Sequence, residues 1–404
     1  MTYAVLLLRK QLADHGRLAA MGMAAFVLFV LVIFFAKGGK APGLIVSPVV
    51  AGALLSLRSG AAMEAVRRTF WFWLFLAFLA VWVFLGATLG ETRYQASDLL
   101  NMALLGGFLL FAAEVSRVLS TRQILWTIAV VGAVSAFLSI IVHVVRAPHL
   151  MERLIPLGRA GNPIPGAGGV AIALIAAAAL WREQGIRRAQ ELALALALAI
   201  PLIAALVWTQ SRAPIVAVCL ALPLAFGLYR RGAFAVLIAC AGTWLAVSGL
   251  VLFEEPLKDL VCGFGNGWCR PSYRTQIWDW VVNQIAAHPV LGSGPSFRFS
   301  KEWMSHAHNG LLGTALYFGL VGLAAFGVMI AVYARNLIRQ PDGALRFFGL
   351  ASLIFSFGYM GADLSNPFAF FNTHYLFMWF PIFLVSVRGE QAPAASSPDS
   401  LQRM

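Results

Sequence analysis

Two closely spaced histidines mark the place in this sequence where a proton could be transferred. They stand in the run Ser305-His-Ala-His-Asn309, at the end of a long polar interval that begins at Glu254. An imidazole has a pKa near neutrality, so either His306 or His308 could accept a proton from a hydroxyl group. The pair could also bind a metal, but residues two apart on a helix point in different directions, and no carboxylate cluster is nearby. We therefore expect no metal site.

The composition indicates that this polar interval belongs to a membrane protein. Hydrophobic residues make up 60% of the 404 residues and charged residues 12%, with a mean hydropathy of +0.80. A soluble domain carries about 25% charged residues. The net charge of +13 is spread over single or paired basic residues between apolar runs, without the basic stripe of a nucleic-acid-binding protein. We expect membrane lipids, and no nucleic acid, among its partners.

About twelve apolar runs approach the roughly 20 residues that one membrane crossing needs. Their ranges are 18–36, 43–57, 69–89, 98–116, 123–145, 164–181, 190–208, 213–229, 232–253, 308–333, 346–362 and 368–387. They predict an all-α polytopic membrane protein. Transmembrane helices fill 1–253 and 308–387, a loop domain with an amphipathic helix fills 254–307, and 388–404 is a disordered tail.

The distribution of lysine and arginine predicts the orientation. When the connections are assigned alternately to the two sides, one side receives 18 of the 30 basic residues and the other 12. The more basic side of a membrane protein is cytoplasmic. Both termini are therefore expected in the cytoplasm, and the loop domain outside.

The outer side nevertheless keeps more arginine than topology requires. Six of these arginines lie near helix ends: Arg146, Arg153, Arg159, Arg212, Arg270 and Arg274. Guanidinium groups suit planar, bidentate anions, so an anionic partner is expected on this face. The alternative is pairing with lipid phosphate or with the acids Glu152, Glu254, Glu255 and Asp259.

The run from Tyr273 to Ile285 is amphipathic at helical spacing. One face holds Tyr273, Ile277, Trp280, Val281 and Ile285. With its two tryptophans, this helix is expected along the outer membrane boundary. The alternative is a lid that packs on the bundle.

Two of the four cysteines lie in the outer loop. Cys262 and Cys269 are separated by the flexible segment Gly-Phe-Gly-Asn-Gly-Trp. In an oxidising compartment we expect them to form a disulfide. Cys219 and Cys240 lie within apolar runs and are expected to pack there as small apolar residues.

Four short motifs follow one another along the outer connections. They are Gly158-Arg-Ala-Gly-Asn-Pro163, Gln210-Ser-Arg-Ala213, Arg274-x-x-Ile-Trp278 with His288-Pro-Val-Leu-Gly-Ser-Gly294, and His308-Asn309 with Gly319 and Gly322. The last resembles the signature of the O-antigen ligase family, and the others are similar to motifs of the wider O-antigen ligase and polymerase superfamily. Ala213 departs from the glycine that is usual there.

The resemblance implies a GT-C-like glycosyltransferase in the inner membrane of a Gram-negative bacterium. Such an enzyme takes a glycan from undecaprenyl diphosphate and joins it to the lipid A-core sugar at the periplasmic face. The matching positions make His308 the catalytic histidine and Arg212 and Arg274 the essential arginines, and the spacing favours His308 over His306. The further residues expected to bind substrate are Arg146, Arg159, Asn162, Trp278, His306 and Asn309.

The residue chemistry suits this reaction without a metal or another cofactor. The diphosphate is already a good leaving group, so the enzyme needs positive charge around it and a base for the acceptor hydroxyl. Two arginines and a histidine supply both, and we expect inversion at the anomeric carbon. The alternatives are an O-antigen polymerase, a protein O-glycosyltransferase and, from another class, a lipid flippase or transporter, which would show inverted halves or charges at mid-membrane.

Overall fold

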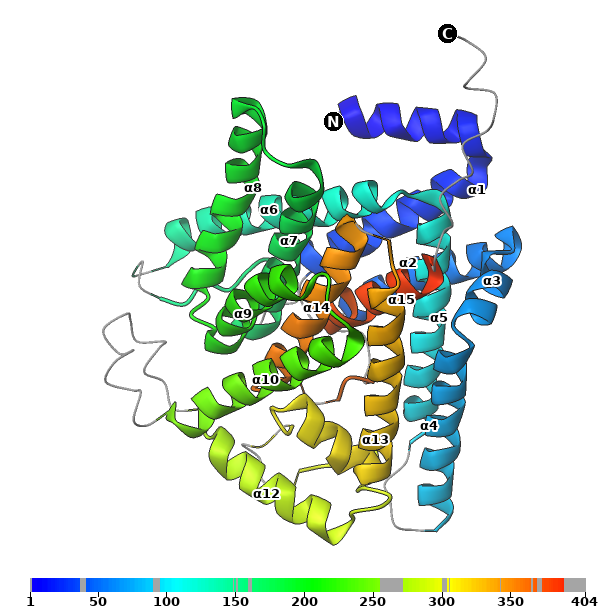
Figure 1. Ribbon diagram of the computed structural model, residues 1–404, viewed down its shortest axis with the longest axis vertical. Helices are drawn as coiled ribbons and strands as arrows, with labels where there is room; N and C mark the ends of the chain where they lie inside the picture. The colour runs from blue at the N-terminus through cyan, green and yellow to red at the C-terminus, as the bar shows by residue number, and fades with distance from the viewer. Residues whose placement is uncertain are drawn as a thin grey trace.

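The computed structural model describes residues 2–36, 41–89, 95–147, 149, 152–158, 162–254, 272–299, 304, 306–341, 343–364, 366–368 and 373–388, with only the backbone of 2–15 and 41–42. All regular elements in these ranges are helices (Figure 1). Their bounds are α1 Thr2–Phe35, α2 Ala41–Ser59, α3 Ala61–Arg68, α4 Phe70–Thr88, α5 Ala96–Val118, α6 Thr121–Arg146, α7 Pro163–Gln184, α8 Ala189–Trp208, α9 Arg212–Leu228, α10 Ala233–Leu252, α12 Arg274–Ala287, α13 Gly310–Ile338, α14 Ala344–Met360, the π-helix η1 Tyr375–Trp379 and α15 Phe380–Arg388.

Within the described ranges, eight helices are long and apolar enough to cross a membrane: α1 from Gly16 onward, α4, α5, α6, α7, α8, α10 and α13. Helices α2 and α3 form a further bent pair, with an angle of 96° between them. The shorter apolar helices are α9, α14 and the segment Tyr375–Arg388. Each predicted run falls on one of these helices, and the all-α polytopic membrane fold is confirmed.

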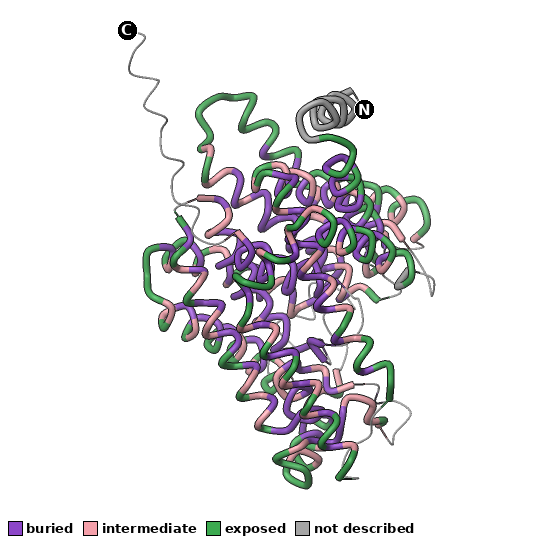
Figure 2. The backbone as a smooth tube through the Cα atoms, turned by 90° about the vertical axis from the view of Figure 1, so that its right-hand side faces the viewer, coloured by how far each residue is buried: buried purple, intermediate pink, exposed green. Residues whose placement is uncertain are grey.

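Helix α14 lies at the centre of the bundle. It packs against α7, α9, α10, α13 and α15, and nearly all of its residues are buried. A helix that is apolar on all sides belongs inside a bundle, and buried segments indeed gather in the middle of the molecule (Figure 2). The turn that follows α14 is also buried, from Gly361 to Leu364. The central helix therefore ends in a buried turn that contains one acid, Asp363.

The outer helices expose apolar side chains. On α8, the exposed ones are Leu192, Leu194, Leu196, Ile200, Ile203 and Val207. A large exposed apolar surface of this kind would be a liability in water, but it is the surface that a lipid environment favours. The side of the bundle formed by α8 therefore suits contact with lipid.

Helix α13 is interrupted at Gly319, and the loop after α12 is bound in the break. Gly319 has φ 69° and ψ −178°, a conformation that is essentially restricted to glycine. Three backbone hydrogen bonds join the two segments: Ser293 N–H to Leu316 O (2.7 Å), Gly294 N–H to Tyr317 O (3.1 Å) and Leu320 N–H to Pro289 O (2.8 Å). A Cβ atom on Gly319 would lie 1.8 Å from Val290 O. Two of the motifs thus form one joint between α12 and α13.

Helix α12 packs on the bundle through a face that differs slightly from the predicted one. Ile277, Trp278 and Val281 are buried, whereas Tyr273 is exposed. The difference arises because Tyr273 has φ 52° and stands before the helix, which begins at Arg274. Helix α12 contacts α10 and α13. Its expected place at the membrane boundary stays a prediction.

Candidate functional site

His308 lies in the turn before α13, with its ring against that of His306. The two ring centroids are 3.6 Å apart, and His306 Nδ1 accepts a hydrogen bond of 3.2 Å from the His308 N–H group. His308 has φ 50°, and α13 begins only at Gly310. The expectation that the two side chains would diverge is therefore wrong, because it assumed helical backbone at both positions.

Asp363, in the buried turn after α14, faces His308. Its Oδ1 atom is 3.4 Å from His308 Nδ1, an ion-pair separation rather than a hydrogen bond. Its Oδ2 atom accepts a hydrogen bond of 3.2 Å from the Tyr359 hydroxyl. Asp363 was not predicted as a site residue, because it is distant from the two histidines along the chain and belongs to no motif. The signal available was an acid directly after an apolar run.

The surroundings give the two histidines different chemistry. Burial lowers the pKa of His306 to about 4; His308 and Arg274 act in the same direction, and Asp363 opposes them. Burial alone would raise the pKa of Asp363, but His308, His306 and Arg274 together lower it, so this group is a carboxylate at neutral pH. His306 is thus neutral and a weak base at neutral pH, whereas His308 has a carboxylate beside it.

Arg274 joins this group from the first residue of α12. Its Nε atom donates a hydrogen bond of 2.7 Å to the carbonyl oxygen of Ala362, the residue before Asp363. We call His306, His308, Asp363 and Arg274 the histidine cluster. It combines a possible base, a carboxylate and a guanidinium group, held at the ends of three helices.

Arg212, the first residue of α9, is connected to Arg274 through Glu254. Its Nη2 atom lies 2.5 Å from Glu254 Oε1, and the other oxygen of Glu254 accepts a hydrogen bond from the Ser272 hydroxyl. That hydroxyl is also 3.5 Å from the backbone N–H of Arg274. The two arginines thus lie along one polar network. Pairing of an outer arginine with an acid, which the sequence left open as an alternative to an anionic partner, therefore occurs at Arg212 through its Nη2 atom.

Arg153 supports the turn that precedes Arg212. Its Nε atom donates to Thr209 O at 2.9 Å, and its Nη2 atom donates to Ser211 Oγ at 3.2 Å. Arg153 was predicted as an outer arginine but not as a residue of the site. Its contacts give it a positioning role for the start of α9.

Unfavourable backbone conformations surround the same groups. Among the described residues, the non-glycine residues with positive φ are Gln210, Tyr273, His308 and Leu364. Each is a residue of the site or stands within two positions of Arg212, Arg274 or Asp363. Such conformations cost on the order of 1–3 kcal/mol each and are concentrated at functional sites. The backbone conformations therefore mark the same four segments as the side-chain contacts, namely those around Arg212, Arg274, His308 and Asp363.

Comparisons with known proteins agree with the motifs. Residues 194–327 match the family model described as O-antigen ligase. The chain is also 26% identical over 335 residues to the O-antigen ligase of Pseudomonas aeruginosa, with 77% of each chain covered. Both matches agree with the resemblance to the O-antigen ligase superfamily that the motifs carry. The segment matched by the family model contains Arg212, Arg274 and His308, and it ends before Asp363.

Two of the residues that the superfamily motifs select have their polar atoms bonded within the protein. The buried Asn309 caps α13 by accepting hydrogen bonds from Leu311 N and Leu312 N at 3.2 Å each, and its Nδ2 atom donates to Gly361 O at 3.3 Å. The indole N–H of Trp278 donates to Ala307 O at 3.1 Å. Both side chains therefore hold the turn of the two histidines, and substrate contact by either remains a prediction.

The remaining predicted residues make other contacts, are exposed or lie outside the described ranges. Asn162 caps α7, where its Oδ1 atom accepts from Ile164 N at 3.0 Å. Arg146 is exposed at the last residue of α6. Arg159, Cys262 and Cys269 lie outside the described residues, so the binding role of Arg159 and the disulfide stay predictions.

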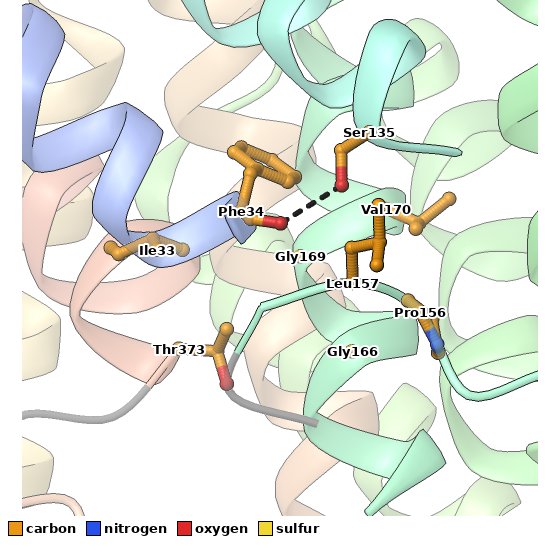
Figure 3. A pocket seen from close by; sticks show the side chains of 9 residues that line it. All are labelled: Ile33, Phe34, Ser135, Pro156, Leu157, Gly166, Gly169, Val170 and Thr373. Atoms are coloured by element: carbon orange, nitrogen blue, oxygen red, sulfur yellow. Dashed lines mark hydrogen bonds between the residues drawn. The ribbon is translucent and has the colours of Figure 1, made fainter. Parts of the chain in front are cut away.

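A small pocket lies beside Pro156 and Leu157 of the segment 152–158 (Figure 3). It is lined by Ile33, Phe34, Ser135, Pro156, Leu157, Gly166, Gly169, Val170 and Thr373. Ser135 Oγ donates to Phe34 O at 2.9 Å. Gly158 has φ 99°, and a Cβ atom there would lie 2.6 Å from Ile33 O, which explains the first glycine of its superfamily motif. The lining is mainly apolar and includes no member of the histidine cluster.

Proposed function

We propose that this protein is an O-antigen ligase. It is a glycosyltransferase that joins a glycan carried on undecaprenyl diphosphate to a sugar of lipid A-core. The observation that carries the proposal is the histidine cluster, in which His308, Asp363 and Arg274 converge from separate helix ends. The match of residues 194–327 to the O-antigen ligase family model and the similarity to the ligase of Pseudomonas aeruginosa support the reaction class.

His308 is the general base of the proposed reaction. Because its Nδ1 atom faces Asp363 at 3.4 Å, Nε2 is the nitrogen available to take the proton from the acceptor hydroxyl. The carboxylate fixes the ring and stabilises the imidazolium that forms. The low pKa of His306, about 4, makes it a poor base at neutral pH.

Arg274 and Arg212 stabilise the departing diphosphate. The acceptor oxygen attacks the anomeric carbon while the bond between that carbon and the phosphate oxygen breaks, and undecaprenyl diphosphate leaves. The hydroxyl proton goes to His308, and attack opposite the leaving group inverts the configuration. Guanidinium donors aimed at the diphosphate stabilise the charge that develops there. The residues that we assign to this step do not require a metal.

The reaction is placed at the periplasmic face of the inner membrane. Lipid-linked donor and lipid A-core both have headgroups at a bilayer surface. The arginines and histidines lie at helix ends, where charge is less costly than at mid-membrane. The positive-inside distribution puts these ends outside the cytoplasm and both termini within it.

Deletion of the gene tests the biological assignment. Surface polysaccharide should disappear while lipid-linked polymer accumulates. A copy of the gene on a plasmid should restore the surface polysaccharide. An O-antigen polymerase uses the same donor with a second lipid-linked glycan as acceptor, so its loss would instead leave single repeats on lipid A-core. That second pattern would refute the ligase assignment.

Purified protein tests the chemistry. Lipid-linked glycan and lipid A-core are incubated with the protein in EDTA, and the product is separated by size. We expect transfer that requires both substrates and yields an inverted linkage by NMR. Abolition of wild-type transfer by EDTA would show that the metal-independent mechanism is wrong.

A further inference from the structure

The two histidines and Asp363 could also bind a cation that the proposed reaction does not use. We propose that His306, His308 and Asp363 form a site for a divalent transition metal such as Zn²⁺, and that its occupation inhibits transfer. The inhibitory part rests on the proposed role of His308 as base. The binding part stands on geometry alone.

Three ligand atoms, one from each side chain, lie within 4.8 Å of one another. Ligand atoms about 2.0–2.2 Å from a tetrahedral zinc ion are about 3.4 Å apart. The separation of 3.4 Å between His308 Nδ1 and Asp363 Oδ1 fits that spacing. The ring of His306 lies directly beside that of His308, with a centroid separation of 3.6 Å and a tilt of 37°. Small rotations of these rings would complete a three-ligand site.

The donor set determines which metals are expected. Two imidazole nitrogens and one carboxylate oxygen suit Zn²⁺, Cu²⁺ or Ni²⁺, whereas Mg²⁺ and Ca²⁺ prefer oxygen ligands. The Tyr359 hydroxyl holds Asp363 Oδ2 at 3.2 Å, so the other oxygen is already turned toward His308. Orientation of a ligand by a neighbouring hydrogen bond of this kind raises metal affinity.

Two contacts oppose binding. Coordination through His306 Nδ1 would replace the weak hydrogen bond of 3.2 Å from His308 N–H, and coordination through Nε2 would require the other tautomer. The guanidinium of Arg274 also contributes to the lowered pKa of Asp363, and its positive charge repels a cation. We therefore expect reversible binding rather than a permanently held structural metal.

Inhibition follows from the number of lone pairs on imidazole. A neutral imidazole has one nitrogen that carries hydrogen and one that carries a lone pair. Whichever nitrogen of His308 binds the metal, that lone pair is used, so His308 can no longer accept the acceptor's proton. A metal bound to Asp363 would also end the pairing of this carboxylate with the His308 ring. Metal at this site and general-base catalysis are therefore mutually exclusive.

Metal binding is measured on the purified full-length protein in detergent. Co²⁺ is titrated and followed by the visible absorption of tetrahedral cobalt, and Zn²⁺ is titrated by calorimetry. We expect one saturable site, from which Zn²⁺ displaces Co²⁺ and a large excess of Mg²⁺ does not. His306→Ala and Asp363→Asn should each weaken binding at least about 10- to 100-fold.

The exposed residue His288 provides the matched control, because it follows α12 and lies outside the cluster. His288→Ala should bind Zn²⁺ like the wild type. Undiminished binding by His306→Ala and Asp363→Asn, or the absence of saturable binding in the wild type, would overturn the proposed site. Thermal unfolding curves establish that the compared variants are folded.

Transfer assays separate this inference from the proposed function. Wild-type protein that is active in EDTA should lose transfer over the Zn²⁺ range that fills the site, and renewed EDTA should restore it. Full transfer at saturating Zn²⁺ would overturn the inhibition and the base role of His308, while the binding data would stand. Absence of transfer under all conditions would count against the ligase proposal and leave the metal site supported by calorimetry.

Discussion

The Nδ1 atom of His308 lies 3.4 Å from the Oδ1 atom of Asp363, with the two side chains 24% and 9% exposed. This pair joins the start of α13 to the end of the central helix α14. A carboxylate in this position orients an imidazole and stabilises its charged form. His308 thus has a paired carboxylate, whereas burial lowers the pKa of its neighbour His306 to about 4 although Asp363 opposes that shift.

Replacement of His308 tests the base assignment. Loss of a general base typically costs about 10²- to 10⁴-fold in rate, so His308→Ala should abolish detectable transfer while leaving donor binding largely intact. His306→Ala should cost much less, because that side chain is expected to act through the hydrogen bond to the His308 backbone. Transfer is measured with purified substrates in EDTA. Near-normal transfer by His308→Ala would contradict the assignment.

Replacement of Asp363 tests the paired carboxylate. Asp363→Asn retains the shape of the side chain but removes the charge that stabilises the imidazolium. We expect kcat to fall at least about tenfold with a smaller change in KM, because the lost interaction belongs to the transition state. Tyr359→Phe is the matched comparison and should cost less, since it removes one hydrogen bond to the other oxygen. Equal activity of Asp363→Asn and wild type would rule out a role for the pair.

Replacement of the arginines by lysine tests the diphosphate contact. Arg212→Lys and Arg274→Lys keep the positive charge but lose the planar guanidinium group, so we expect transfer to fall by at least about tenfold in a folded protein. The exposed Arg298, in the loop after α12, is the control, and Arg298→Lys should remain active. If the two site variants transfer at the wild-type rate, positive charge alone stabilises the diphosphate, and the proposed bidentate contact between guanidinium and diphosphate is wrong.

The break in α13 gives a prediction about stability. Gly319→Ala would place a Cβ atom 1.8 Å from Val290 O in a conformation restricted to glycine. The strain alone costs on the order of 1–3 kcal/mol, so the midpoint of thermal unfolding should fall markedly. Gly327 lies in the same helix with nothing within 4 Å of its ideal Cβ position. Gly327→Ala should therefore unfold at or above the wild-type temperature. Equal unfolding temperatures of the two variants would contradict the packing of the loop after α12 against Gly319.

The low pKa of His306 predicts a pH dependence of stability. Its pKa is about 4 in the folded protein against an ordinary value of 6.5, so the unfolded chain binds more protons between these values. Stability from this group is complete above about pH 6.5 and is lost as the pH falls toward 4. His306→Asn should remove this part of the dependence when unfolding is followed from pH 4 to 7. Asp363, whose pKa is lowered from 3.8, acts below that window. Unchanged pH dependence in His306→Asn would contradict the burial of a neutral histidine.

The sequence by itself determined the class of fold and the main polar motifs. Apolar runs of the length of a bilayer must form helices, because a backbone in lipid satisfies its hydrogen bonds only within regular structure. For that reason every predicted run corresponds to a helix. His308, Arg212 and Arg274 could be predicted as site residues because they lie in short motifs that can be recognised without knowledge of their surroundings.

Tertiary structure decided how these groups combine. Asp363 carries no local signal, and Glu254 was predicted only as one of four acids that could pair with an outer arginine. They reach His308 and Arg212 because the ends of α9, α10, α13 and α14 meet in the folded bundle. His308 has a left-handed backbone conformation, so both histidines lie close to Asp363. Helical spacing had predicted that their side chains would point in different directions. Contacts between residues distant in the chain depend on the packing of helices, and a periodic pattern of apolar residues does not contain that information.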